Sequence, residues 1–345
     1  SLFTALVVTR LIFNFLLNRN WLKSLSMLHI IKSANINFMK IAMPLAIATC
    51  IFFVAGIGFG VTRGNKLFGV DFRGGDSVTF NFVQKVDQGK ISSVLGAVGE
   101  KDAEVQYQKD IAGGGAETLR VTSSSGSAAK VIGALQSNFP NSKFQKIGQQ
   151  EVGPTVGAEI RNSAIAASLM AMFGILIYVA IRYEFFFAVA AVAAVLHDVL
   201  LTIGVYCIAN YVSHRQFNAT VVAAVLTIIG FSLNDKIVVF DRIREDLKLG
   251  VRGSFKDVIN QALNQTLSRT IITSGTVFIA TMCLYLWGGG VINDFAFTFL
   301  VGIITGTYSS IYIASYLILL FHKGQRPAIG GSSQVAMENV PAAKA

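Results

Sequence analysis

The chain has 345 residues, of which 53% are hydrophobic and 14% are charged, and its formal net charge is +10. Soluble globular domains carry about 25% charged residues, so this composition excludes that class and indicates a membrane protein. The basic residues flank hydrophobic stretches instead of forming one soluble patch. That pattern argues against nucleic-acid binding and for a chain that crosses a lipid bilayer repeatedly.

The chain opens with a short apolar stretch, residues 1–17, which has neither an initiating Met nor a signal-peptide cleavage pattern. We predict that this stretch is the end of a preceding transmembrane helix. Residues 18–39 are predicted to be a cytoplasmic linker, because they carry basic residues ahead of the first long apolar stretch.

Six later stretches are long enough to cross a bilayer, which takes about 20 residues in a helix. Placing their basic flanks in the cytoplasm puts both ends of the chain there and leaves one large segment, residues 61–159, on the outer side. The predicted transmembrane helices span residues 40–60, 160–181, 185–211, 217–240, 270–287 and 295–321.

The outer segment alternates strand-like and helical stretches. Residues 76–82 alternate polar and apolar side chains, as a half-buried strand does. The pattern continues with a helix at 91–98, strands at 103–108 and 118–122, a helix at 127–139 and a strand at 143–149. This β-α-β-β-α-β order predicts a small ferredoxin-like α+β domain.

The cytoplasmic segments after the fourth and sixth spans differ in character. Residues 241–269 combine charge with apolar side chains at helical spacing, which predicts an amphipathic helix along the inner membrane face. Residues 322–345 are rich in Gly, Ser, Ala and Pro and are predicted to be a disordered tail.

Small residues four positions apart allow helix backbones to approach closely in lipid. Gly56 with Gly60, and Gly302 with Gly306, have this spacing. Gly56, Gly58 and Gly60 also match part of a nucleotide-binding pattern, but they lie inside a predicted span. We therefore predict helix contacts there and no cofactor.

The three cysteines, Cys50, Cys207 and Cys283, lie on separate predicted spans without metal-binding or disulfide spacing. We expect small buried side chains there and predict no metal site.

Asp235 stands deep in the fourth predicted span, between Asn234 and Lys236. An ionised aspartate at the bilayer centre costs ~2.5–3.5 kcal/mol on insertion scales. One interpretation is a structural ion pair with Arg269 that locks two helices. The other is a proton-binding carboxylate on a conduction path, with Arg269 as a cation that cannot lose its proton. Residue spacing leaves both interpretations open.

A second acid, Asp198, follows His197 in the third predicted span. Adjacent residues on a helix point about 100° apart, so we expect these two side chains to serve helix packing. Asp198 and Asp235 together are a candidate pair for an intramembrane aspartic protease. The glycine-flanked acid typical of such proteases is absent, and the sequence offers no convincing Ser/His or Cys/His set, so we do not predict an enzyme.

Several motifs in the same order resemble SecF, the membrane subunit of the SecD–SecF protein-export complex. The stretch LNDKIVVFDRIRE at 233–245 is similar to the family's fourth-helix signature. GVDFRGG at 69–75, with Asp71, Gly74 and Gly75, resembles the motif past the first helix. VGPTVG at 152–157, with Gly153 and Pro154, resembles the motif before the second, and NQTLSRT at 264–270 the start of the fifth. Residues 1–5, with Thr9-Arg10 after them, look like the end of SecD's last helix, which implies a fused SecDF polypeptide.

The resemblance implies a fold, a function and partners. The fold is an α-helical polytopic membrane protein, the six-helix half of a resistance–nodulation–division-like transporter, in a bacterial or archaeal cytoplasmic membrane. The function is to use the proton motive force to assist preprotein translocation and release on the outer side. The implied partners are a SecD half, the SecY/SecE/SecG translocon, the preprotein and the bilayer.

The resemblance also assigns residues. Asp235 matches the family's proton-pathway aspartate and Arg269 its functional arginine, with Asn234 in the same pathway. Lys236 and Asp198 are secondary candidates for this site. The five motif residues Asp71, Gly74, Gly75, Gly153 and Pro154 are expected to act as a hinge or linker rather than to bind substrate. Sodium would need several oxygen ligands, so the residues favour protons as the coupling ion.

Two positions depart from the family pattern: Lys236 replaces a small polar residue, and Arg73 stands where Thr is frequent. A second cation beside Asp235 would favour the ionised carboxylate and oppose proton binding. We instead expect Lys236 to extend its side chain to the cytoplasmic face. Two alternatives remain: a related exporter of lipids or small hydrophobic molecules, which usually carries a much larger external domain, and a structural partner without proton flux.

Overall fold

The computed structural model describes residues 3–19, 21, 36–110, 116–213 and 215–327. Most of the predicted linker at 18–39 and of the tail at 322–345 lies outside these residues, as do Ser1 and Leu2. The chain divides into two units, residues 1–34 and 35–345. In the first unit, a π-helical turn, Thr4–Val8, leads into helix α1, Thr9–Asn18, which is apolar.

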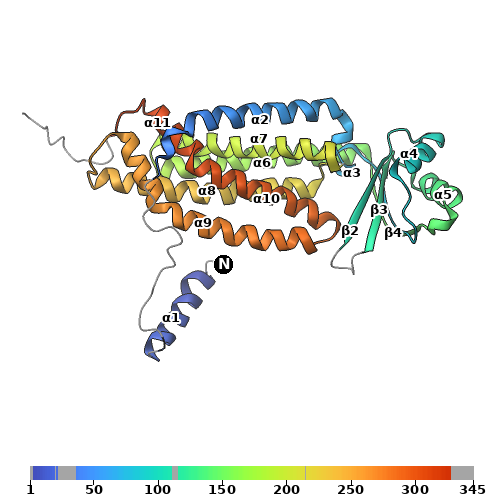
Figure 1. Ribbon diagram of the computed structural model, residues 1–345, viewed down its shortest axis with the longest axis horizontal. Coiled ribbons are helices and arrows are strands. Elements are labelled where there is room, and N and C mark those ends of the chain that lie inside the picture. The colour runs from blue at the N-terminus through green and yellow to red at the C-terminus, as the bar shows by residue number, and fades with distance from the viewer. Residues whose placement is uncertain (1–2, 20, 22–35, 111–115, 214, 328–345) are drawn as a thin grey trace, which may run out of the picture. The chain divides into compact units, whose positions relative to one another are not determined.

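The second unit contains six segments long and apolar enough to span a membrane, among the residues that the structure describes. They are the helices α2 (Ala42–Arg63), α6 (Pro154–Arg182), α7 (Phe185–Ser213), α8 (Ala219–Lys248) and α9 (Phe255–Trp287), and the pair α10 (Gly290–Ile311) and α11 (Ile313–Phe321). This confirms the predicted polytopic helical architecture (Figure 1).

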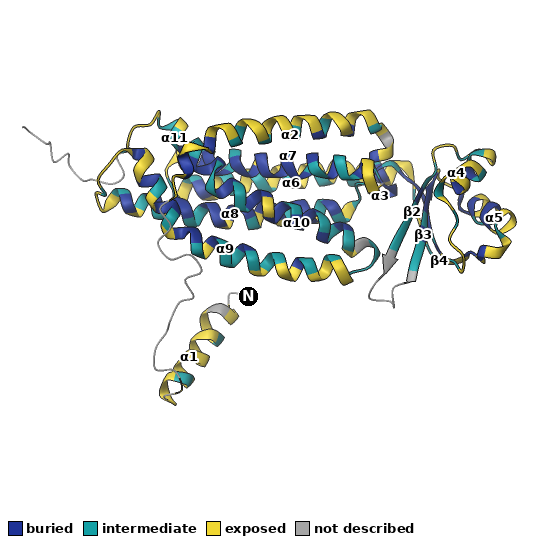
Figure 2. Ribbon diagram, viewed as in Figure 1, coloured by how far each residue is buried: buried dark blue, intermediate teal, exposed yellow. Residues whose placement is uncertain are grey.

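The bundle is organised around α7. This helix packs against α2, α6, α8 and α10, while α10 packs most extensively against α8. The sequence of α7 is rich in alanine and is the most buried of the candidate spans, as a central helix with close neighbours must be. Helices α2, α6 and α9 leave most of their apolar surface uncovered (Figure 2).

Glycines set the closest helix contacts. A Cβ atom on Gly56 of α2 would lie 2.6 Å from the backbone of Gly204 on α7, and one on Gly60 would lie 2.7 Å from Cys207 Sγ. On α10, a Cβ atom on Gly302 would lie 2.2 Å from the side chain of Ile228 on α8. Both predicted glycine pairs therefore lie at helix–helix contacts.

The cysteines differ from expectation. Cys207 is buried against α2, but Cys50 and Cys283 are exposed, because they lie on α2 and α9, which are mostly uncovered.

The segment predicted as a separate amphipathic helix is part of the membrane helices. Helix α8 continues to Lys248, and α9 begins at a capping box formed by Ser254 and Asp257 and runs unbroken to Trp287. No proline interrupts it, so nothing ends the helix where the apolar span begins. Apolar side chains of its first three turns are buried, including Phe255, Val258 and Ile259.

The sheet domain between α2 and α6 has four antiparallel strands in the order β2-β3-β1-β4. In chain order its elements are β1 (Gly75–Asn81), α4 (Gln88–Ala97), β2 (Glu104–Asp110), β3 (Ala116–Ser123), α5 (Ala128–Asn138) and β4 (Gln145–Val152). Helices α4 and α5 cover one face, over a core that includes Phe80, Leu95, Leu119 and Leu135 (Figure 1). This is the predicted ferredoxin-like order, and it confirms a small α+β domain.

A short parallel β-bridge joins residues 67–69, which follow α2, to Phe217 in the loop between α7 and α8. Phe217 N donates to Leu67 O at 2.8 Å, and Gly69 N donates to Phe217 O at 2.7 Å. The chain entering the sheet domain is therefore fastened beside the start of α8.

We predict that Gly56→Ala lowers the thermal stability of the protein in detergent, by about 1–3 kcal/mol for an overpacked contact. The new methyl group meets backbone atoms of Gly204, which cannot move aside as a side chain does. Gly58→Ala on the same helix is the matched control, because nothing lies within 4 Å of its Cβ position. Equal melting curves of the two variants by circular dichroism would contradict the α2–α7 packing.

Candidate functional site

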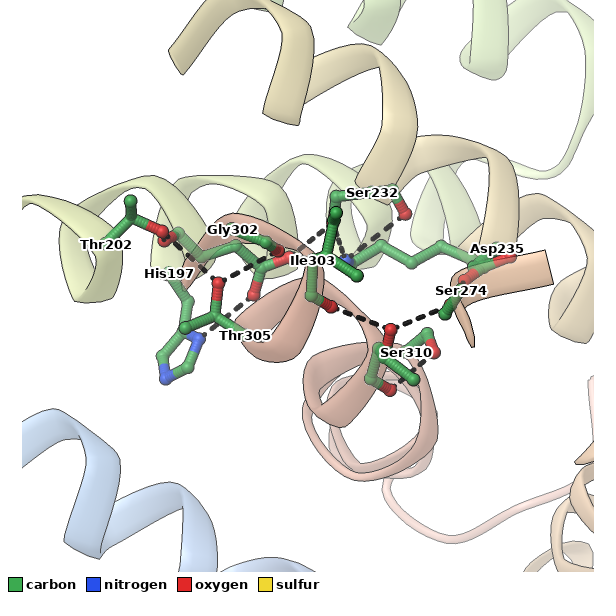
Figure 3. A network of polar contacts seen from close by, with 12 residues as sticks. His197, Thr202, Ser232, Asp235, Ser274, Gly302, Ile303, Thr305 and Ser310 are labelled. Carbon is green, nitrogen blue, oxygen red and sulfur yellow. Dashed lines mark hydrogen bonds and ion pairs between the residues drawn. The ribbon is translucent and has the colours of Figure 1, made fainter. Parts of the chain in front are cut away.

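Helices α7, α8, α9 and α10 enclose a polar network inside an otherwise apolar bundle (Figure 3). Two carboxylates belong to it. Asp198 on α7 is fully buried, and Asp235 on α8 is 4% exposed. Burying a charge in such surroundings requires a partner or protonation, so the partners of these two acids decide what the network can do.

Lys236 binds Asp198 inside the bundle and does not extend to the cytoplasmic face. Its Nζ donates to Asp198 Oδ2 at 2.6 Å, and both side chains are 0% exposed. Ser232, one turn earlier on α8, donates to the same carboxylate oxygen and accepts from Lys236 Nζ at 2.5 Å. The prediction that Lys236 extends to the cytoplasmic face is therefore wrong. The reason is that α7 places a carboxylate within reach inside the bundle, where an ion pair satisfies both charges.

His197 extends this pair toward α2. Its Nδ1 lies 3.3 Å from Asp198 Oδ1, and its Nε2 lies 2.9 Å from Thr49 Oγ1. The two adjacent residues of α7 thus contact each other as well as neighbouring helices, beyond the packing role that we expected.

Asp235 has different partners. Ser274 Oγ on α9 donates to Asp235 Oδ2 at 3.1 Å, and Thr307 Oγ1 on α10 donates to Ser274 Oγ at 2.8 Å. Figure 3 shows Asp235 and Ser274 at this junction. No Lys or Arg of the described chain forms an ion pair with Asp235. The carboxylate is therefore buried against a chain of hydroxyl groups.

Arg269 and Asn234 are exposed on the outside of the bundle. Arg269 lies on α9 five residues before Ser274, about 7.5 Å along the axis. The described structure contains no ion pair between Arg269 and Asp235, so it does not support a locking pair between these two residues. Both exposed side chains lie instead on surfaces that another membrane segment can reach.

The two acids do not form a protease pair. Asp198 is held by Lys236, Ser232 and His197, and Asp235 is held by Ser274. Aspartic proteases need two carboxyl groups that share a proton, and the described structure contains no hydrogen bond between these two. Among the described residues there is also no group of three or more potential metal ligands.

Ser232, Ser274 and Thr307 were not predicted as members of the site. Isolated hydroxyl residues are common in apolar spans, and they usually donate to the backbone of their own helix. Thr307 does both, because it also bonds the carbonyl of Ile303 at 2.7 Å. The one feature of the sequence that could have indicated them is that they lie on the span that carries Asp235 or on later spans that pack against it.

A second polar cluster lies where the bundle meets the sheet domain. Arg215 donates to Asp294 at 2.6 Å and to Asn293 at 2.7 Å, and its guanidinium lies 4.7 Å from the ring centroid of Phe297. Arg215 lies in the turn between α7 and α8, and the start of α10 supplies it with both a carboxylate and an aromatic face. Burial lowers the pKa of Arg120 on β3, and the carboxylates of Asp294 and Asp71 offset part of that effect.

The residues of the two turn motifs meet at the same junction. Asp71 accepts from Gln150 Nε2 on β4 and from the backbone N of Ala219, the first residue of α8, both at 2.8 Å. Gly74 has φ +76°, and a Cβ atom there would lie 2.7 Å from Pro154, the first residue of α6. A hinge role for Asp71, Gly74, Gly75, Gly153 and Pro154 stays a prediction.

Comparisons with known proteins agree with this architecture. Residues 131–324 match the model of the family described as protein export membrane protein SecD/SecF, C-terminal. A protein translocase subunit SecF from Calditerrivibrio nitroreducens is 40% identical over 303 residues, which cover 85% of this chain and 96% of that protein. One from Thermodesulfovibrio yellowstonii is 37% identical over 306 residues, with 86% and 98% covered.

Solved structures match as well. The crystal structure of SecDF from Thermus thermophilus, a translocon-associated membrane protein, superposes with a TM-score of 0.79 at 32% identity. SecDF in its super-membrane-facing form gives 0.68 at 31%. Each match covers 93% of this chain but 43% of the SecDF chain, so this chain spans less than half of those proteins. The chain belongs to the SecD/SecF family of protein export membrane proteins.

Proposed function

We propose that this chain is the SecF part of a Sec protein-export component that uses the proton motive force to assist preprotein translocation and release. The observation that carries the proposal is the environment of Asp235. Its carboxylate is buried in the bundle, bonded only to a serine in the described structure, while the neighbouring cation is bound elsewhere. Protonation removes the cost of that buried charge, ~2.5–3.5 kcal/mol at the bilayer centre.

The pair of Lys236 with Asp198 supports Asp235 as the titrating group. Two opposite charges in direct contact compensate each other, so Lys236 is not available to hold Asp235 ionised. On this proposal Lys236 and Asp198 are a fixed element of the bundle, and Asp235 is the acid that gains and loses a proton.

The hydroxyl chain provides a way to couple that proton to helix movement. Ser274 donates to the ionised carboxylate and itself accepts from Thr307. A protonated Asp235 carries its own donor, so the direction of these hydrogen bonds changes. Helices α8, α9 and α10 would respond together, because each supplies one member of the chain.

Asn234 and Arg269 are proposed to face a SecD half, since both are exposed on the outside of the bundle. On this proposal residues 1–17 are the end of SecD's last helix in a fused chain. Arg269 then serves the proton pathway at the interface between the two halves. The SecY/SecE/SecG translocon and the preprotein are further proposed partners, in a cytoplasmic membrane with both chain ends cytoplasmic and the sheet domain outside.

An exporter of lipids or small hydrophobic molecules is not favoured, because the curated relatives are SecF subunits and the soluble domain is a single small sheet domain. The other alternative, a structural partner that conducts no protons, is distinguished from the proposal by the following experiment.

We predict that Asp235→Asn abolishes proton-gradient-driven stimulation of preprotein translocation while leaving the ATP-driven part intact, because an amide cannot exchange the proton. The measurement uses vesicles that contain the translocon and this chain with its SecD half, with and without an imposed proton gradient. Asp241→Asn is the matched control: it removes the same charge on the same helix, from an exposed side chain. Undiminished gradient dependence in Asp235→Asn would exclude Asp235 as the titrating group.

We also predict that Lys236→Met destabilises the protein by about 3–5 kcal/mol, because it leaves Asp198 buried without its cation. The double variant Asp198→Asn/Lys236→Met should recover most of that loss, since neither position then carries a charge without its partner. Thermal unfolding of the wild type, the two single variants and the double variant in detergent gives the coupling free energy. If the two losses simply add, the buried ion pair does not exist in solution.

A further inference from the structure

A cavity lies at the base of the sheet domain, away from the polar network around Asp235. It has a volume of about 520 Å³. Its walls come from the end of α2, the 3-10 turn Gly64–Leu67, the short helix α3 (Val70–Arg73), the turn after β3 and the start of α6. The lining residues are Arg63, Lys66, Arg73, Gly74, Gly75, Asp102, Ser123, Ser124, Ser125 and Pro154.

The cavity is strongly basic. Arg63, Lys66 and Arg73 face a single lining carboxylate, that of Asp102, so the lining carries a formal charge of +2 (three cations less one anion). Arg63 is engaged with Asn210, whose Oδ1 accepts from its Nε at 2.9 Å. Lys66 and Arg73 have no ion pair or side-chain hydrogen bond within the described part of the chain. Two cations are thus left to face the cavity together.

The cavity lies at the ends of two candidate membrane spans. Arg63 is the last residue of the membrane-spanning helix α2, and Pro154 is the first residue of the membrane-spanning helix α6. Because lipid headgroups lie at the ends of membrane spans, we expect the cavity at their depth. Val61 and Val156, two residues from these positions, are 75% and 50% exposed, so the cavity borders apolar surface.

The turn motifs build the walls. Gly75 has φ +131°, and a Cβ atom there would lie 2.4 Å from the carbonyl oxygen of Ser123, so only glycine allows this approach. The one acid of the first motif, Asp71, does not line the cavity, because Gln150 and the backbone N of Ala219 hold its carboxylate. Ser124 and Ser125 add exposed residues with hydroxyl groups to the opposite wall.

We propose that this cavity binds the phosphate group of an anionic phospholipid headgroup in the leaflet on the sheet-domain side. Arg73 presents a planar guanidinium suited to a phosphate, and Lys66 adds a second charge. The formal charge of +2 favours a headgroup with net negative charge over a zwitterionic one. The proposal does not depend on proton transport by Asp235.

The test is native mass spectrometry of the full chain in detergent, titrated separately with phosphatidylglycerol, with phosphatidylcholine of the same acyl chains and with sodium phosphate. We expect phosphatidylglycerol to bind more tightly than phosphatidylcholine, and sodium phosphate not to displace it. Lys66→Gln and Arg73→Gln should each weaken phosphatidylglycerol binding about fivefold, since one basic residue near a membrane surface contributes about 1 kcal/mol.

Lys130→Gln is the matched control, because it removes the same charge from an exposed position of the sheet domain, on α5 outside the cavity lining. Circular dichroism melting curves confirm that the variants are folded. Equal lipid affinities of Arg73→Gln, Lys66→Gln and Lys130→Gln would overturn the site. Displacement of the lipid by millimolar phosphate would overturn the lipid as its occupant and assign the cavity to a soluble phosphate.

Discussion

The bundle depends on one contact: an ammonium and a carboxylate that meet in its interior with no access to water. Lys236 and Asp198 come from α8 and α7, two helices that bury at least half of their apolar spans. An ion pair of this kind contributes little net stability compared with apolar packing, but the loss of either partner is severe. It therefore fixes the rotation of α8 against α7. That rotation determines where every other polar side chain of α8 points.

Asp235 shows the consequence. Adjacent helical residues point about 100° apart, so once Lys236 is directed at α7, Asp235 is directed at α9. One turn of α8 thus contains two buried charges with separate partners on opposite neighbours. A carboxylate beside a lysine in the sequence need not form an ion pair with it, because the two side chains leave the helix in different directions.

The sequence was sufficient for the features that depend on local pattern. Hydropathy located the six spans, strand and helix periodicity located the ferredoxin-like order, and glycine spacing located the close contacts at Gly56 and Gly302. It was insufficient for features that depend on which helices are neighbours. The partners of Lys236, Arg215 and Asp235 lie 38, 79 and 39 residues away in the sequence. The local sequence around each residue does not predict these partners. The sequence predicted a break within α9 because its first turns are more polar than the rest. The helix is nevertheless continuous, since no proline or glycine interrupts it at that point.

The hydrogen bond between Asp71 and the first amide of α8 connects that helix to the chain that leads into the sheet domain. Ala219 and Asp235 are 16 residues apart on one uninterrupted helix, a rigid rod of about 24 Å. The sheet domain is fastened to one end of the rod by Asp71 and by the backbone bridge at Phe217. The buried acid and the attachment of the sheet domain therefore lie on the same continuous helix, so a shift of α8 along its axis would displace both together.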